Sequence, residues 1–137
     1  MNTWPEHYLG LPWKLGGRSM TGLDCWGLLR FIYGVQFGIT LSEHPVSGKL
    51  ADADMVVQEE LGAHCWVPII SPQVGDVVAL GKGAGLCHVG VYVETPAPSI
   101  LHIAADCPSV IVGLKLLYRK GYQNVKYYRH VERDPNN

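Results

Sequence analysis

The sequence predicts an α+β domain in which one early helix packs on an antiparallel sheet formed by the second half of the chain. Apolar residues at helical spacing begin near Cys25, and short β-branched runs separated by Gly, Pro and Asp follow Gly75. The helical pattern precedes the strand patterns instead of alternating with them. This order is typical of a helix packed against an antiparallel sheet.

Composition and charge narrow the organisation of the chain. Its 137 residues, 47% of them hydrophobic and 17% charged, predict a single domain over residues 1–137 with its own core. A net charge of -1 without a Lys/Arg cluster argues against nucleic-acid binding, which needs concentrated positive charge. No apolar run approaches the roughly 20 residues that span a bilayer.

The N-terminal residues contain no basic segment followed by an apolar stretch, so we expect synthesis in the cytoplasm without a signal peptide. In a reducing compartment the four cysteines are expected to be free thiols. Cys65, Cys87 and Cys107 are expected to be buried core thiols, the usual place of an unreactive cysteine.

The first half of the chain predicts a loop followed by helices. Five Gly and Pro residues between Leu9 and Leu23 indicate an ordered loop. A helix starts near Cys25 and ends at Gly38, residues 39–50 are rich in turn formers, and a second helix is expected from Asp52 to Leu61, ended by Gly62. The second half predicts five strands: Asp76–Leu80, Cys87–Glu94, Ile100–Ala104, Ser109–Val112 and Val125–His130.

Cys25 stands where the glycine-rich loop turns into the helix, with Asp24 as the predicted N-cap. The N–H groups and the positive dipole end of a helix stabilise a thiolate, so this position is expected to lower the thiol pKa. A first-turn N–H is also placed to donate to the oxyanion of an acyl-transfer intermediate. A buried structural thiol is the alternative for Cys25 alone.

Two histidines supply the partners that a nucleophilic thiol needs. In the strand from Cys87, alternation places His88, Gly90 and Tyr92 on the face opposite the valines, and Gly90 is expected to leave space beside His88. If this strand and the next form a hairpin, His102 lies about opposite His88 and can orient its ring. A half-buried histidine taken alone is more often structural than catalytic. Taken together with Cys25, His88 and His102 predict a catalytic set.

The chain resembles the NlpC-type cell-wall cysteine peptidases. The resemblance rests on five ordered blocks: Pro12–Gly17, Gly22–Leu28, Val74–Val78, His88–Val93 and Leu101-His102. It implies a papain-like fold, with the nucleophile at the N-terminus of a helix packed on an antiparallel sheet. The Asp-Cys-Trp-Gly-Leu form resembles the branch found in phage tail-assembly proteins.

Carried over residue by residue, the resemblance implies that Cys25 is the nucleophile, His88 the base and His102 the third polar residue. Asp24 matches the acid that meets the substrate's free amino group. Trp13 and Trp26, where many members have Tyr and Ser, are expected to line the substrate groove, which leaves the bond cut undetermined. The implied activity is hydrolysis of peptide bonds in peptidoglycan stem peptides by a phage or prophage tail component that contacts other tail proteins.

The sequence alone leaves three alternative functions open. A metal site built from Cys25, His88, His102 and Cys87 uses the same residue types, but no paired ligand spacing is present. We therefore expect no metal and no cofactor. A thiol acyltransferase uses the same residues with a different acceptor, and a structural tail module needs none of them.

Overall fold

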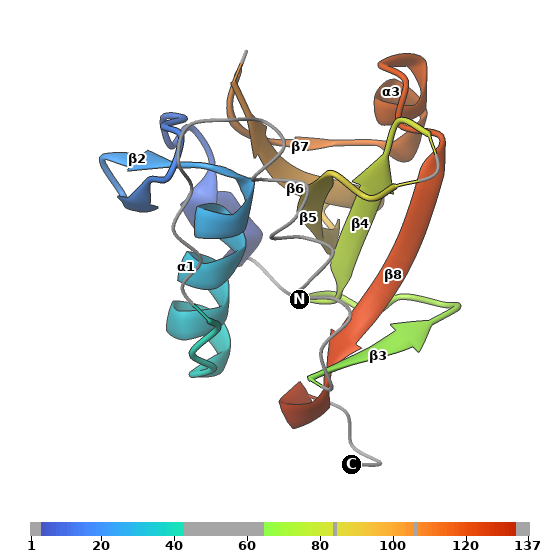
Figure 1. Cartoon of the computed structure of the whole chain (residues 1–137). Coiled ribbons are helices and arrows are strands. Elements are labelled where there is room, and N and C mark those ends of the chain that lie inside the picture. Colours follow the sequence, from blue (N-terminus) through green and yellow to red (C-terminus); the bar gives the residue numbers. More distant parts are fainter. Residues whose placement is uncertain (1–3, 43–64, 84, 106, 134–137) are drawn as a thin grey trace.

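The computed structural model describes residues 4–42, 65–83, 85–105 and 107–133. Its centre is a six-stranded antiparallel sheet with strand order β3-β8-β4-β5-β6-β7 (Figure 1). Helix α1 (Cys25–Phe37) lies to one side of the sheet and the short helix α3 (Leu114–Arg119) lies at its other side. The predicted α+β class is confirmed.

The strands of the large sheet are β3 (Trp66–Ile69), β4 (Val77–Gly81), β5 (His88–Glu94), β6 (Pro98–Ala104), β7 (Cys107–Val112) and β8 (Asn124–His130). A separate two-stranded ribbon pairs β1 (Arg18–Ser19) with β2 (Gly22–Leu23). Short 3-10 turns, η1 (Trp4–Tyr8) and η2 (Val131–Arg133), stand near the two ends of the chain.

Helix α1 begins and ends at residues whose local chemistry requires it. Asp24 has an extended backbone and accepts a hydrogen bond from the Gly27 N–H at 2.7 Å, which satisfies one donor that a helix start leaves unpaired. Gly38 adopts a left-handed conformation with φ 65° and its N–H donates to the Tyr33 carbonyl, a C-cap that favours glycine. These caps set the position of Cys25 as the first helical residue.

The sheet separates two apolar clusters, because alternate residues of each strand point to opposite faces. The larger cluster joins α1, through Leu28, Leu29 and Ile32, to the valines of β5 at positions 89, 91 and 93. The smaller cluster joins Val78, Leu80 and Ile100 to Leu117 of α3. The β5 residue His88 therefore starts a strand whose valine face packs against α1.

The five predicted strands are present, and no end is shifted by more than two residues. The β1–β2 ribbon lies inside the segment expected to be a loop, and β3 and α3 were not predicted. The helix expected from Asp52 to Leu61 lies outside the described residues. Cys65 is exposed, so its expected place in the core is wrong: it precedes the edge strand β3, where its carbonyl accepts the Val131 N–H.

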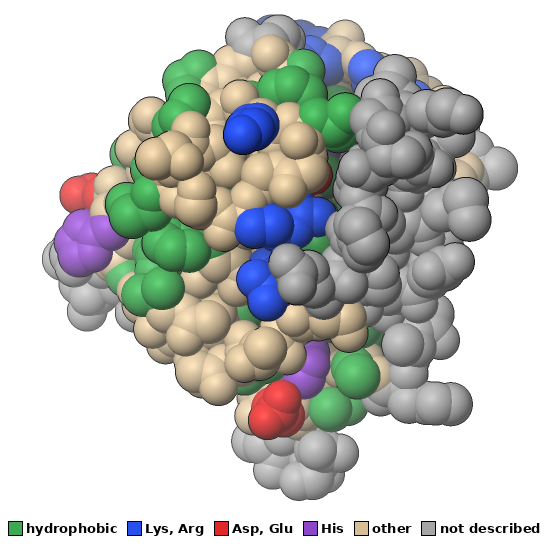
Figure 2. Space-filling model, turned by 60° about the vertical axis from the view of Figure 1, so that its left-hand side comes forward, with side chains coloured by type: hydrophobic (Ala, Val, Ile, Leu, Met, Phe, Trp, Pro, Cys, Tyr) green, Lys and Arg blue, Asp and Glu red, His purple; other side chains and the backbone are tan. Residues whose placement is uncertain are grey.

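No helix among the described residues has the length and apolar character needed to cross a membrane. The face shown in Figure 2 presents Lys and Arg side chains near its centre, between apolar and neutral atoms. Between Trp4 and Ser42, the basic residues are Lys14, Arg18 and Arg30, whereas the acidic ones are Glu6 and the buried Asp24. With three basic and two acidic residues, of which Arg18 pairs with Asp24, this part of the chain carries a formal charge of +1.

Candidate functional site

Cys25 lies at the junction between α1 and β5. Its sulfur accepts hydrogen bonds from the backbone N–H groups of Val89 and Trp26. The Val89 N–H belongs to the peptide bond that directly follows His88, so the thiol lies against the start of the strand that carries His88. Residues far apart in the sequence are thus joined at the N-terminus of a helix, as the sequence predicts.

The thiol does not have the lowered pKa expected from its place at a helix start. Burial raises the pKa of Cys25 from 9.0 to about 11, the nearby Asp24 and Cys87 add to the rise, and the hydrogen bonds from Val89 and Trp26 oppose it. Removal from water disfavours the charged form more than the helix N-terminus favours it. In the free protein Cys25 is therefore a neutral thiol at neutral pH.

His88 and His102 contact each other directly. Nε2 of His88 lies 3.0 Å from Nδ1 of His102, a hydrogen bond, and the two rings meet edge to face at 85°. Both side chains are buried, 6% and 2% exposed. The contact that the predicted orientation of His88 by His102 requires is thus present in the structure.

The sequence predicts His102 about opposite His88. In the structure the two histidines are not directly opposite each other in the ladder. The β5–β6 register pairs Val91 with Leu101, which puts His102 across from Gly90 and makes His88 its diagonal neighbour. A β-bulge follows between His102 and Ala104. Bulges increase local twist and re-aim side chains, and diagonal pairs on one face are within reach of rings.

Gly90 allows the rings of His88 and His102 to meet. The sequence predicts that it leaves open space beside His88, but side chains of β6 lie against it instead. A Cβ added at Gly90 would lie 2.7 Å from Cγ2 of Ile100 and 3.2 Å from Cβ of His102. The space beside His88 is therefore occupied by β6 and is not open to substrate. Glycine is needed here because the facing side chains approach its backbone closely.

Asp24 joins the loop to the helix. One carboxylate oxygen accepts from the Gly27 N–H and from Arg18, each at 2.7 Å, and the other accepts from the Gly16 N–H at 2.9 Å. The side chain is buried, and Arg18 balances its charge. The structure gives Asp24 a capping role, and its predicted contact with a substrate amine stays a prediction.

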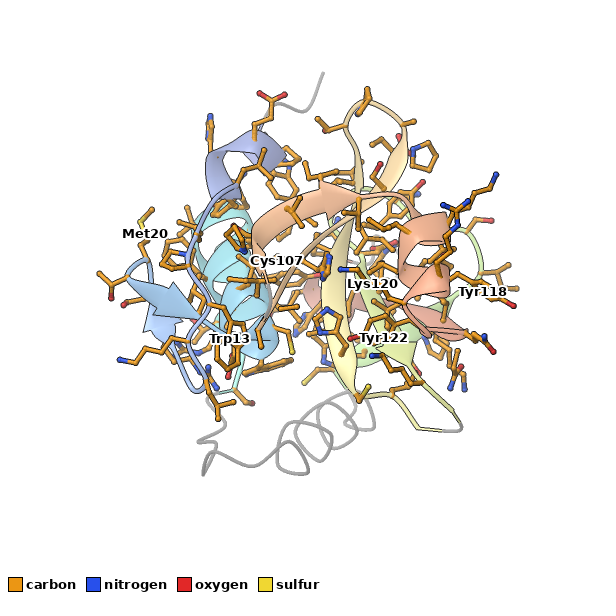
Figure 3. All side chains as sticks on the ribbon, turned by 90° about the horizontal axis from the view of Figure 1, so that it is seen from above. Trp13, Met20, Cys107, Tyr118, Lys120 and Tyr122 are labelled. Atoms are coloured by element: carbon orange, nitrogen blue, oxygen red, sulfur yellow. The ribbon has the colours of Figure 1, made fainter. Side chains whose placement is uncertain are left out.

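The two tryptophans differ in their surroundings. Trp26 is 2% exposed and donates its Nε1–H to the Ser42 carbonyl at 3.0 Å, so it is part of the core and does not line an open groove. Its position in the first turn directs the indole toward the core side of α1. Trp13 is partly buried, bridges to Leu23, and lies beside α1 in Figure 3, so it remains the candidate for substrate contact.

Tyr122, which the sequence did not single out, stacks on His88. The ring centroids are 5.4 Å apart and the planes differ by 24°. The Lys82 ammonium lies 4.7 Å from the centroid of the same tyrosine ring. Tyr122 follows Gly121 in the connection from α3 to β8 (Figure 3), and no local motif distinguishes it from the other tyrosines.

Among the described residues, no group of three or more His, Cys, Asp or Glu side chains has an arrangement that would hold a metal ion. His88 and His102 bond to each other through one ring nitrogen each. The described side chains support nucleophilic chemistry by a thiol.

Comparison with known proteins identifies the family of this chain. The model of the NlpC/P60 family matches residues 10–130. Protein P54 of Enterococcus faecium is 28% identical over 97 residues, covering 66% of this chain and 16% of that protein. Probable endopeptidase p60 of Listeria seeligeri is 32% identical over 88 residues, covering 64% of this chain and 14% of that protein.

The chain therefore spans less than a fifth of the length of these relatives. Among solved structures, the NlpC/p60 domain of the peptidoglycan hydrolase SagA superposes with a TM-score of 0.62 at 17% sequence identity, covering 90% of each chain. That similarity shows the fold. With the family match over residues 10–130, it shows that this chain belongs to the NlpC/P60 family.

Proposed function

We propose that this protein is a cysteine peptidase that hydrolyses amide bonds in the stem peptides of bacterial peptidoglycan. Cys25 is the nucleophile, His88 is the base and His102 orients His88. The observation that carries the proposal is the His88–His102 hydrogen bond beside a thiol that contacts the peptide after His88. A nucleophile, a base and an orienting group in this order are the parts that acyl transfer requires.

The hydrogen bond between the histidines decides which nitrogen acts. When His88 carries its proton on Nε2 and donates it to Nδ1 of His102, the lone pair of His88 is on Nδ1. Nδ1 then takes the proton of Cys25 as the sulfur attacks the amide carbon. Because the resting thiol is neutral, proton transfer accompanies attack instead of preceding it.

The oxyanion formed by this attack needs N–H donors. At the start of α1, the Gly27 N–H donates to the Asp24 side chain and the Leu28 N–H donates to the Asp24 carbonyl. The Trp26 N–H donates to the Cys25 sulfur. This leaves the N–H of Cys25 itself as the first-turn donor that we assign to the oxyanion. His88 then protonates the leaving amine and activates the water that releases the acyl group.

The names of the relatives support the substrate. The Listeria proteins are named probable endopeptidases and SagA is named a peptidoglycan hydrolase.

The test is mass spectrometry of purified muropeptides before and after incubation with the protein. The parent should convert a stem peptide into two fragments, Cys25→Ala should produce none, and the control Cys65→Ala should match the parent because Cys65 is exposed and outside the site. Equal turnover by Cys25→Ala and the parent would sink the proposal. A product joined to an added amine, in place of the free acid, would identify an acyltransferase. No turnover by any of the three would favour a structural module.

We propose further that the domain serves in a phage or prophage tail, made in the cytoplasm and acting at the cell wall beside other tail proteins. Support comes from the Asp24-Cys25-Trp26-Gly27-Leu28 string, which resembles the tail-assembly branch. Purified particles from an induced host should contain the protein, detected by peptide mass spectrometry. Its absence from particles that carry all other tail proteins would contradict this role.

A further inference from the structure

We propose that Tyr122 is a positioning residue for the catalytic imidazole, an inference that rests on the function proposed above. The tyrosine ring covers one face of His88, with centroids 5.4 Å apart and planes 24° from parallel. His102 contacts the same imidazole at its edge, through Nε2. The two contacts therefore act on His88 in different directions.

Each contact restrains a different motion of the ring. The hydrogen bond that His88 donates to His102 sets the tautomer of His88 and the position of Nε2. The torsion that rotates an imidazole about its Cβ–Cγ bond has a broad minimum, so a ring held at one nitrogen still tilts. A parallel aromatic ring against one face limits that tilt. In the proposed mechanism, this keeps Nδ1 in position to take the proton of Cys25.

Tyr122 is itself held in place from several sides. Its N–H donates to the Leu117 carbonyl at 3.1 Å, and the next N–H, of Gln123, donates to the Gly81 carbonyl at 3.1 Å. Its ring packs against the apolar cluster beneath α3, and the Lys82 ammonium lies 4.7 Å from the ring centroid. The connection between α3 and β8 thus gives the site a rigid wall, which a catalytic base requires of its supporting residues.

The contact that carries the proposal is between the two rings, so the proposal distinguishes two substitutions. Tyr122→Phe keeps an aromatic ring of the same shape, whereas Tyr122→Leu fills much of the volume with a side chain that cannot stack. Tyr118→Ala is the matched control, since this tyrosine is on α3, is 56% exposed and lies outside the site.

The test measures kcat and KM of the full chain on a stem peptide for these variants. We expect Tyr122→Leu to lower kcat by about 10-fold or more with KM within about twofold, because a misplaced base affects the chemical step more than binding. Tyr122→Phe and Tyr118→Ala should match the parent. Unchanged kcat in Tyr122→Leu, or an equal loss in Tyr122→Phe, would overturn the proposal.

A second measurement needs no substrate and separates this inference from the proposed function. Long-range proton–nitrogen NMR spectra report the tautomer of each imidazole, with His88 assigned by comparison with His88→Asn. The parent should show one sharp set of His88 ring signals in the tautomer that the bond to His102 sets, and Tyr122→Leu should broaden or double these signals through ring motion while Tyr122→Phe does not. An unchanged His88 signal in Tyr122→Leu would refute the positioning role. A changed signal with an inactive parent would instead retain the positioning role and reject the peptidase.

Discussion

Nε2 of His88 lies 3.0 Å from Nδ1 of His102, although the ladder places His102 across from Gly90. The contact is diagonal across the β5–β6 pair, at the point where a bulge interrupts β6. It uses one ring nitrogen of each histidine. The mechanism proposed above pairs the other nitrogen of His88 with the thiol, and the consequences of that pairing are measurable.

Replacing His102 should impair the base without unfolding the site. We expect His102→Ala to lower kcat by roughly 10²–10⁴-fold, because His88 loses the partner that sets its tautomer. His102→Asn should retain more activity, since its amide also hydrogen-bonds an imidazole. His7→Ala is the control, as His7 is exposed on η1. Similar near-parental rates for both His102 variants would remove His102 from the site.

Alkylation of Cys25 should increase steadily with pH. Because burial raises its pKa to about 11, the thiolate fraction grows about tenfold per pH unit between pH about 7 and 9. The rate of Cys25 labelling by iodoacetamide should follow that slope. Peptide mass mapping measures it in a Cys65→Ser background, which removes the exposed thiol. His88→Ala should leave the slope unchanged. A plateau that begins below pH 7 and vanishes in His88→Ala would reveal a preformed thiolate–imidazolium pair instead.

The neutral thiol should also make the fold sensitive to alkali. Cys25 loses its proton near pH 9.0 when unfolded and near pH about 11 when folded, so the folded state binds more protons between these values. Its contribution, roughly 3 kcal/mol, is fully present below pH about 9 and is lost as pH rises to about 11. Urea unfolding should show a steeper alkaline loss in the parent than in Cys25→Ala. Parallel curves would contradict the raised pKa.

Two glycines of α1 should respond oppositely to alanine. A Cβ at Gly27 would overlap the Gly17 carbonyl oxygen, whereas one at Gly34 meets nothing within 4 Å. Gly34→Ala should raise the free energy of unfolding by about 0.5–1 kcal/mol through helix propensity. Gly27→Ala should lower it by about 1–3 kcal/mol through overpacking. Chemical unfolding measures both, and stabilisation by Gly27→Ala would show that the loop yields without cost.

Much of the local structure was predictable because its causes lie within a few residues. Asp24 and Gly38 cap α1 through contacts to residues three to five positions away, and both ends of the helix are where the sequence placed them. The alternation of valines in β5 predicts its buried face. The same local patterns, with the resemblance to NlpC-type peptidases, brought Cys25, His88 and His102 forward as candidates.

What the sequence could not show depends on contacts between distant segments. The diagonal register of His88 and His102, the stack of Tyr122 on His88 and the burial of Trp26 follow from sheet twist and packing across elements. The raised pKa of Cys25 is of the same kind: the helix start is visible in the sequence, but the desolvation that outweighs it is created only when β5 covers the thiol. Local chemistry thus determined which residues were candidates, and tertiary packing decided their protonation, partners and exposure.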